Sequence, residues 1–456
     1  MTLQAGSAKQ TPEQPVPVSY RSLSIGQISP DRLDSFGAWS GHGLGKSNRF
    51  RITEWQGGHW LVTPDGHPLV VAGLCHASIN PKRRQPGDAI ATKFNDDPSR
   101  YADDLLQWMK ATGFNTFSYG VPAGTRETMN RIEDLNLVPG FIRTPEFVDP
   151  FDPQWRANIA RLIAERVPRN RADPRVIGYS LSVPLLFSPA MERPRIWRFG
   201  QIKRQNYLMF IQSLPASAPG KQAYVNHLKK TCASFTDYVK RRGGVAGVTS
   251  FDGLLGKDLS ALQDYEELPP DDAPFFTQMW DDVTRFIVAE IRKHDPQTLV
   301  FSYRFIRIVR WPDPWIEAML RGVGPHVDAF LPEIYGDNSY REIVDGIGRI
   351  TGKPSLIADG MRCQEFNYAE EADAGLEAAV YERMFTRLLA SPWFLGGCVC
   401  EYIGGLPDFE FYSPRPKEPR TGVRNPDFTE RNPLFECFQR LHLRKHQLRL
   451  ELLKGN

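Results

Sequence analysis

Several familiar signatures are missing from this chain of 456 residues, and each absence excludes a class of protein. Its six cysteines form no CxxC pair, which argues against a zinc-ribbon or thioredoxin-type motif. No apolar run reaches the roughly 20 residues that a membrane helix needs. The opening segment has no apolar core of a secretory signal, so we expect a soluble, cytoplasmic protein whose thiols stay reduced.

Charge of one sign is also lacking, because 56 Lys and Arg residues face 53 Asp and Glu residues. This balance gives no support to a nucleic-acid or membrane partner. No GxGxxG motif follows the first expected strand, which weakens a dinucleotide-binding interpretation. We therefore expect no cofactor, and the sequence favours no particular oligomeric state.

What is present is a long alternation of short apolar runs and helical patterns. The expected strands are Leu69–Cys75, Phe114–Ser118, Val138–Ile142, Val176–Leu181, Leu299–Tyr303, Val327–Leu331, Ser355–Ala358 and Leu395–Cys400. The expected helices are Tyr101–Thr112, Thr125–Leu135, Gln154–Val167, Asp282–His294, Trp315–Gly322, Tyr340–Ile350, Ala372–Ala390 and Leu434–Leu453. Eight such repeats predict an α/β fold, a single (β/α)8 TIM barrel over residues 46–456.

Two further segments frame this barrel. Residues 1–45 are rich in Pro, Ser, Gly and Gln and predict a flexible N-terminal arm. Residues 49–66 carry two turn signals and predict a β-hairpin that caps the bottom of the barrel. Between strands four and five, residues 188–297 predict a helical insertion that covers the barrel mouth. Its aromatic and basic residues suggest either a sugar platform or ordinary surface: Trp197, Arg198, Arg204 and Tyr207.

Catalytic residues of a TIM barrel sit at the carboxyl ends of the strands. Here three carboxylates follow the sixth, seventh and eighth strands: Glu333, Asp359 and Glu401. Converging carboxyl groups are what glycoside hydrolysis requires, so we take these three as the catalytic candidates. Other strand-end residues are candidates for binding substrate: His76, Tyr119, Arg143, Ser182, Arg304, Tyr335 and Tyr402.

Each candidate also has a purely structural interpretation. Asp359 could cap the following segment, and Glu333 could form a salt bridge with Arg304. Glu401 could line a polar cavity. His76 could be a metal ligand, but it lacks an HxH partner, so we expect no metal and a hydrogen-bonding role instead.

A set of short motifs, in order along residues 50–440, resembles the agarase-like glycoside hydrolases of the large (β/α)8 clan. The motifs are Trp60-Leu-Val-Thr-Pro-Asp-Gly-His-Pro68, Gly73-Leu-Cys-His76, Ala111-Thr-Gly-Phe-Asn-Thr116, Asp149-Pro-Phe-Asp-Pro153, Asp173-Pro-Arg-Val-Ile-Gly-Tyr179, Pro219-Gly-Lys-Gln222, Ile291-Arg-Lys-His-Asp-Pro296 and Thr351-Gly-Lys-Pro354. The resemblance implies a barrel that acts on carbohydrate, with a Glu acid/base after strand four and a Glu nucleophile after strand seven.

The chain departs from that pattern at both catalytic positions. The fourth-strand Asn-Glu pair falls on Val183 and Pro184, neither of which can exchange a proton. The seventh-strand Glu falls on Asp359, whose side chain is one methylene shorter. The fifth-strand Arg of the family is kept as Arg304, and strand six carries Glu333 and Tyr335.

Three functions stay open from the sequence. The first is a glycosidase for β-linked oligo- or polysaccharide, in which Asp359 acts with Glu333 or Glu401. The second is a catalytically silent barrel that binds a saccharide or a partner. The third is a polysaccharide lyase-type elimination, with a Tyr or His base and Arg304 neutralising a uronate.

Overall fold

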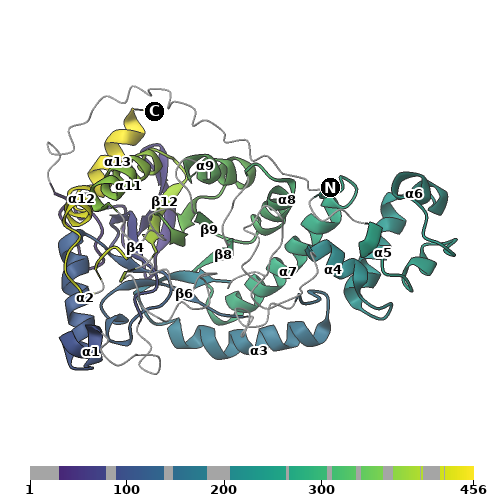
Figure 1. Cartoon of the computed structure of the whole chain (residues 1–456), viewed down its shortest axis with the longest axis horizontal. Helices are drawn as coiled ribbons and strands as arrows, with labels where there is room; N and C mark the ends of the chain where they lie inside the picture. The colour runs from purple at the N-terminus through teal and green to yellow at the C-terminus, as the bar shows by residue number, and fades with distance from the viewer. Residues whose placement is uncertain are drawn as a thin grey trace, which may run out of the picture.

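A closed barrel of parallel strands forms the centre of this computed structural model (Figure 1). The structure describes residues 30–78, 89–137, 147–181, 206–262, 267–305, 311–334, 340–362, 373–400, 402–403, 422–425 and 427–455. The barrel strands follow one another in chain order: β4 (Val71–Leu74), β5 (Thr116–Phe117), β6 (Asn130–Asp134), β7 (Val176–Ser180), β8 (Leu299–Phe305), β9 (Ala329–Ile334), β10 (Ser355–Ile357) continued by β11 (Asp359–Gly360), and β12 (Phe394–Val399). Pairing of β12 with β4 closes the ring, which confirms the predicted TIM barrel.

Helices surround the ring on its outer side. They are α1 (Ala89–Phe94), α2 (Pro98–Thr112), α3 (Pro153–Asn170), α7 (Ala273–His294), α8 (Pro314–Val323), α9 (Tyr340–Thr351), α11 (Ala374–Leu389), α12 (Asn432–His442) and α13 (Lys445–Lys454). Three of them begin with the same device, an Asp cap followed by Pro at the first helical position: Asp97, Asp152 and Asp313. The last segment, predicted as one helix, is divided between α12 and α13. None of the described helices combines the length and the hydropathy that crossing a membrane requires.

The barrel interior is a compact apolar cluster that excludes water from the lower part of the ring. Its members alternate inward along the strands: Val71, Ile177, Phe301, Leu331, Leu356 and Leu395. Phe36, Phe50 and Leu61 belong to the same cluster and close it from below. Leu61 lies on β2 (Gly58–Val62), which pairs antiparallel with β1 (Arg51–Trp55) and β3 (Pro68–Leu69), so the predicted hairpin cap is present.

Part of the expected N-terminal arm is packed against the barrel. Ala38 is fully buried, and the side-chain amide of Asn130 donates to the carbonyl of Phe36 at 2.6 Å. Asp31 accepts hydrogen bonds from the backbone and ring of His446 on α13. The chain is therefore held to the barrel from residue 31 onward, because these contacts join it to both the bottom of the ring and the last helix.

The third strand is where the sequence interpretation failed. Residues 125–135 were expected to be helical and 138–142 to be a strand, but β6 occupies Asn130–Asp134 and residues 138–142 lie outside the described part. Of the five residues of β6, only Ile132 is apolar. The polar ones are satisfied by tertiary partners: Arg131 is buried and pairs with Asp173 at 2.5 Å and Glu133 at 3.1 Å. A strand held by such partners carries no hydrophobic periodicity.

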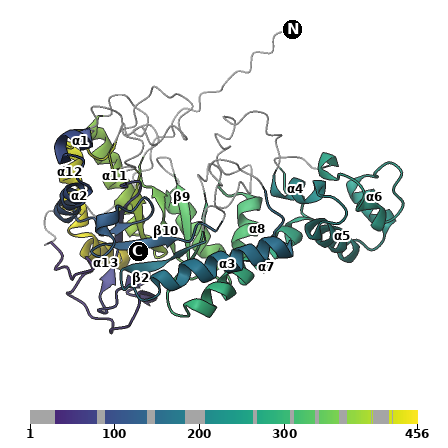
Figure 2. The same cartoon turned by 90° about the horizontal axis from the view of Figure 1, so that it is seen from below.

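The insertion between β7 and β8 contains α4 (Tyr207–Ser213), α5 (Pro219–Thr231), α6 (Phe235–Arg242) and the short turns η5 (Asp252–Leu254) and η6 (Ser260–Leu262). Its described part extends beyond the N-terminal end of α7, to one side of the strands, in both views (Figures 1 and 2). The expected cover over the barrel mouth is therefore not formed by these helices. Tyr207 is buried against Trp280 of α7 and cannot serve as a sugar platform, whereas Trp197, Arg198 and Arg204 lie outside the described residues.

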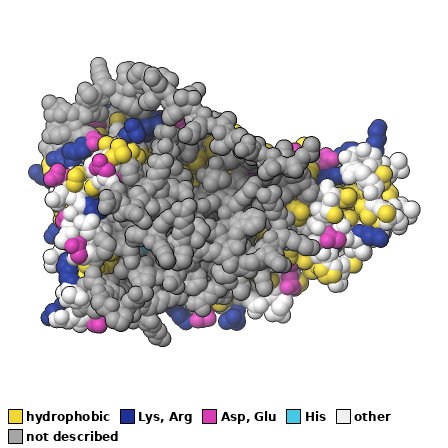
Figure 3. All heavy atoms as spheres, viewed as in Figure 1, with side chains coloured by type: hydrophobic (Ala, Val, Ile, Leu, Met, Phe, Trp, Pro, Cys, Tyr) yellow, Lys and Arg dark blue, Asp and Glu magenta, His cyan; other side chains and the backbone are white. Residues whose placement is uncertain are grey.

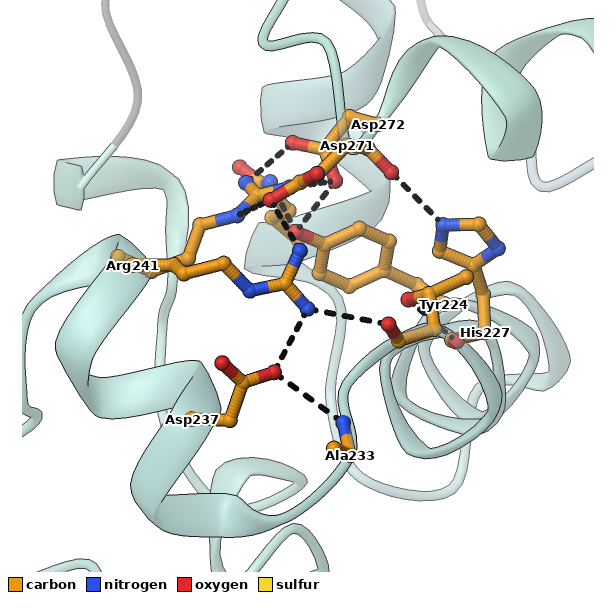
Figure 4. A network of polar contacts seen from close by, with 10 residues as sticks. Tyr224, His227, Ala233, Asp237, Arg241, Asp271 and Asp272 are labelled. Carbon is orange, nitrogen blue, oxygen red and sulfur yellow. Dashed lines mark hydrogen bonds and ion pairs between the residues drawn. The ribbon is translucent and has the colours of Figure 1, made fainter.

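A polar network fixes the insertion to the start of α7 (Figure 4). The fully buried carboxylate of Asp272 accepts from both terminal nitrogens of Arg242, at 2.5 and 2.7 Å. Arg241 bridges Asp237 and Asp271, and Tyr224 donates to Asp272 at 3.2 Å. On the face shown in Figure 3, charged side chains of both signs are interspersed on the described surface, as the balanced composition predicts.

Candidate active site at the carboxyl ends of the strands

Polar side chains from most of the strands gather at the carboxyl end of the barrel. The residues that contact one another there are His76 after β4, Tyr119 after β5, Asp134 on β6, Arg304 on β8, Glu333 on β9, Asp359 on β11 and Cys400 after β12. Below them lies the apolar interior of the ring. Parallel strands bring their carboxyl ends to one face, which explains how residues so far apart in sequence converge.

Glu333 and Asp359 are register partners across the parallel pair β9 and β11. Residues paired in this way point to the same face of the sheet, so both carboxyl groups are directed to the same side. Their side chains are each only 5% exposed. The two acids predicted from the sequence are therefore brought together at the end of the barrel.

One oxygen of Glu333 is held by two donors. The Tyr119 hydroxyl donates to Oε1 at 3.0 Å, and Nε of Arg304 donates to the same oxygen at 2.8 Å. The salt bridge between Arg304 and Glu333, considered from the sequence as a structural alternative, is thus formed. The second oxygen, Oε2, receives no hydrogen bond from the described residues and is the atom left to meet a ligand.

Arg304 is itself tightly placed. Its guanidinium lies over the Tyr119 ring at 3.5 Å from the centroid, within the range of a strong cation–π contact. A terminal nitrogen stands 3.6 Å from the Asp134 carboxylate. Burial lowers the pKa of Arg304, but the charges around it, those of Tyr119, Glu333 and Asp134, outweigh this effect and raise the pKa above its ordinary value.

Asp359 is held from another side. Nε2 of His76 lies 3.2 Å from Oδ2 of Asp359, and the Gly360 amide donates to Oδ1 at 2.7 Å. His76 adopts a left-handed backbone with φ of 55°, and its amide donates to the Tyr119 carbonyl at 2.9 Å. This turn directs the imidazole back over the strand ends, towards Asp359.

The two carboxyl groups have pKa values displaced in opposite directions. Burial raises the pKa of Glu333, Arg304 opposes this rise, and the negative charge of Asp359 adds to it, so that the pKa lies above its usual value. Burial also tends to raise the pKa of Asp359, but the hydrogen bond and charge of His76 and the charge of Arg304 hold it well below its usual value. A pair displaced in this way suits one proton donor and one permanent anion.

The other sequence candidates are distributed differently. Tyr402 is fully buried outside the ring, where its ring packs on Trp108 of α2 and its hydroxyl accepts from Arg424 at 2.8 Å. It therefore lies apart from the strand-end group. Four more candidates lie outside the described residues, together with Val183 and Pro184: Arg143, Ser182, Tyr335 and Glu401.

Two members of the group were not singled out from the sequence. Asp134 was missed because its strand was taken for a helix. Cys400 was recognised as the end of the eighth strand, but a single thiol carries little signal by itself. A search for polar residues at the ends of all eight strands would have found Cys400 in any case, and Asp134 only with β6 correctly placed.

No protein-family profile and no curated protein matches this chain. Solved structures do: an exo-β-agarase matches with a TM-score of 0.72 and 13% identity, over 94% of this chain and 69% of the other. The agarase AgWH50C matches with a TM-score of 0.70 and 15% identity, again over 94% and 69%. The protein PfGH50B matches with a TM-score of 0.71 and 13% identity, over 94% and 71%. At these identities, the similarity shows a shared agarase-like barrel fold.

Proposed function

We propose that this chain hydrolyses a glycosidic bond in a β-linked saccharide, with Glu333 and Asp359 as the reacting carboxyl groups. The observation that carries the proposal is their pairing across β9 and β11 at the catalytic face of a TIM barrel, with pKa values displaced in opposite directions. The agarase-like fold supports agarose fragments as the first saccharides to test.

The two acids would have different roles. Glu333, whose pKa is raised, carries the proton on Oε2 and delivers it to the leaving oxygen, while Tyr119 and Arg304 hold Oε1 in place. Asp359, whose pKa is lowered, stays ionised and stabilises the positive charge that develops at the anomeric carbon. His76 orients this carboxylate through the contact between Nε2 and Oδ2.

The test is a screen of reducing-sugar release from a panel of β-linked oligosaccharides. Replacing Glu333→Gln or Asp359→Asn should each lower kcat by about 100-fold or more, the usual contribution of acid–base groups. Glu165→Gln on α3 and Asp103→Asn on α2 are matched controls, because these acids are exposed on helices outside the ring and should leave activity unchanged. Wild-type release no greater than that of Asp359→Asn on every substrate would overturn the proposal.

The pH profile gives a second check of the assigned roles. Since Glu333 must be protonated to act, activity should fall as pH rises through its elevated pKa. Asp359 should remain ionised over the same range because its pKa is lowered. A rate that instead climbs steadily with pH would contradict Glu333 as the donor.

A second candidate is a silent barrel that binds saccharide without cleaving it. It is favoured by the ion pair between Arg304 and Glu333, which stabilises the ionised carboxylate, and by the Val183-Pro184 sequence at the expected acid/base position. Calorimetric titration of an oligosaccharide that the wild type binds but does not cleave would select this function. The elimination chemistry is less well supported, because the charge of Arg304 is already matched by Glu333 and Asp134.

A further inference from the structure

A second constellation overlaps the acid pair and has a different chemical character. His76, Asp359 and Cys400 each offer a ligand atom, and all three atoms lie within 4.8 Å of one another. They come from the ends of β4, β11 and β12, which are neighbours in the barrel wall. Because the residues are remote in sequence, their convergence is produced by the fold and not by a local motif.

We propose that these three residues bind a divalent transition-metal ion, with zinc as the expected ion. Zinc accepts the imidazole, carboxylate and thiolate ligands that the three residues provide. Calcium and magnesium prefer sets made of oxygen atoms, so the imidazole and the thiol disfavour them. Within the part of the chain that the structure describes, no other group of three potential ligands is this close.

The spacing of the ligand atoms suits a tetrahedral ion. Two ligands at about 2.1 Å from such an ion stand about 3.4 Å apart, and a sulfur ligand at about 2.3 Å stands slightly further from its neighbours. Nε2 of His76 and Oδ2 of Asp359 are 3.2 Å apart. The Cys400 sulfur is within 4.8 Å of a ring nitrogen of His76 and of a carboxylate oxygen of Asp359, so a small side-chain movement completes the triangle.

The backbone that carries the ligands is held in place by hydrogen bonds. The Cys400 amide donates to the Gly360 carbonyl at 3.0 Å, and the buried Arg362 donates to the Cys400 carbonyl at 3.3 Å. On the other side, the His76 amide is bound to the Tyr119 carbonyl. These contacts position all three side chains before an ion arrives, which lowers the entropic cost of binding it.

Three protein ligands leave one tetrahedral position to water or substrate, as in zinc sites that are not purely structural. The proposal is independent of hydrolysis, because it concerns the binding of an ion. The metal site and the proposed acid pair nevertheless have Asp359 in common, and its carboxylate cannot bind a metal ion and contact a sugar at the same time. If hydrolysis occurs, zinc should therefore inhibit it.

The test is a titration of the full chain, stripped of metal by a chelator, with Co²⁺ alone. We expect one cobalt ion to bind per chain and to give a thiolate-to-cobalt charge-transfer band. One equivalent of Zn²⁺ should displace the cobalt and abolish the band. Cys400→Ser and His76→Gln should each weaken binding by at least about 100-fold, since even outer-shell changes cost 10–100-fold. Cys232→Ser, which removes a buried thiol in the insertion, is the matched control and should bind as the wild type does.

Melting curves keep the result interpretable if a variant is less stable. Zinc should raise the melting temperature of the wild type and of Cys232→Ser but not that of His76→Gln. Absence of stoichiometric cobalt binding by the wild type would overturn the proposal, as would a thiolate band that survives Cys400→Ser. Neither result bears on sugar release, so the metal site and the hydrolytic function can fail separately.

Discussion

Removing the Arg304 side chain tests the electrostatics of the strand-end group directly. Above the raised pKa of Glu333, the Arg304→Met variant keeps much of the apolar stem but leaves the ionised Glu333 carboxylate buried without its cation. Side-chain exposures of 11% for Arg304 and 5% for Glu333 place this pair among buried ion pairs, whose breakage costs about 3–5 kcal/mol, and not among surface pairs worth about 0–1 kcal/mol.

The expected shift in melting temperature follows from the size of the chain. An unfolding entropy of about 2.1 cal/mol/K per residue over 456 residues gives about 1 kcal/mol per degree. A loss of about 3–5 kcal/mol therefore lowers the melting temperature by about 3–5 °C. Calorimetry or circular dichroism, at a pH above the raised pKa of Glu333, measures this shift.

A double variant isolates the charge from the packing. In Arg304→Met with Glu333→Gln, the buried charge of Glu333 is removed together with that of its partner, so much of the lost stability should return. The single variant should also recover as pH falls, because without Arg304 the folded-state pKa of Glu333 rises further above its unfolded value. A shift below about 1 °C in the single variant, or simple additivity in the double, would refute this view of the pair.

Three further predictions address the frame around the site. Phe36→Ala should lower the free energy of unfolding by about 3–4 kcal/mol, because this ring closes the barrel from below and packs on Phe50. A loss below about 1 kcal/mol in chemical denaturation would contradict the packing of the N-terminal arm on the barrel. Gly360→Ala should unfold the protein or reduce its yield, since an added Cβ would lie 2.0 Å from the Ile334 carbonyl at a φ of 113°, whereas Gly256→Ala, in open space, should melt as the wild type does. Burial lowers the pKa of His442 well below 6.5, so at a pH between its folded and unfolded pKa values the unfolded chain binds more protons than the folded chain. The melting temperature should therefore rise from about pH 5 to about pH 7.5. A flat profile would count against this burial.

The fold could be predicted largely because buried parallel strands are apolar runs. Val176–Ser180 was expected to within one residue, and Ala329–Ile334 overlaps the expected strand Val327–Leu331, which ended three residues too early. Asn130–Asp134 was missed because its polar side chains are satisfied by Asp173, Glu133 and the backbone of residue 36, contacts that no local pattern reveals. That strand is stabilised by tertiary contacts of its polar side chains and not by a run of apolar residues that the sequence would show.

The candidate site was predictable to the extent that strand ends define it. Glu333, Asp359, Arg304, His76 and Tyr119 were all named from that rule, and the salt bridge of Arg304 with Glu333 was foreseen as an alternative. What the sequence could not show is which of these side chains contact one another. The contact of His76 with Asp359 joins residues 283 positions apart. It depends on a left-handed backbone at His76, which the residue type does not predict.

Proton NMR of a β-linked oligosaccharide incubated with the protein tests the central proposal most directly, because cleavage and elimination give different signals. Hydrolysis by Glu333 and Asp359 predicts new reducing-end anomeric signals with the wild type, and signals that appear at least about 100-fold more slowly with Asp359→Asn. Equal signals from both proteins, vinylic signals of an unsaturated product, or an unchanged spectrum across the whole panel would contradict it.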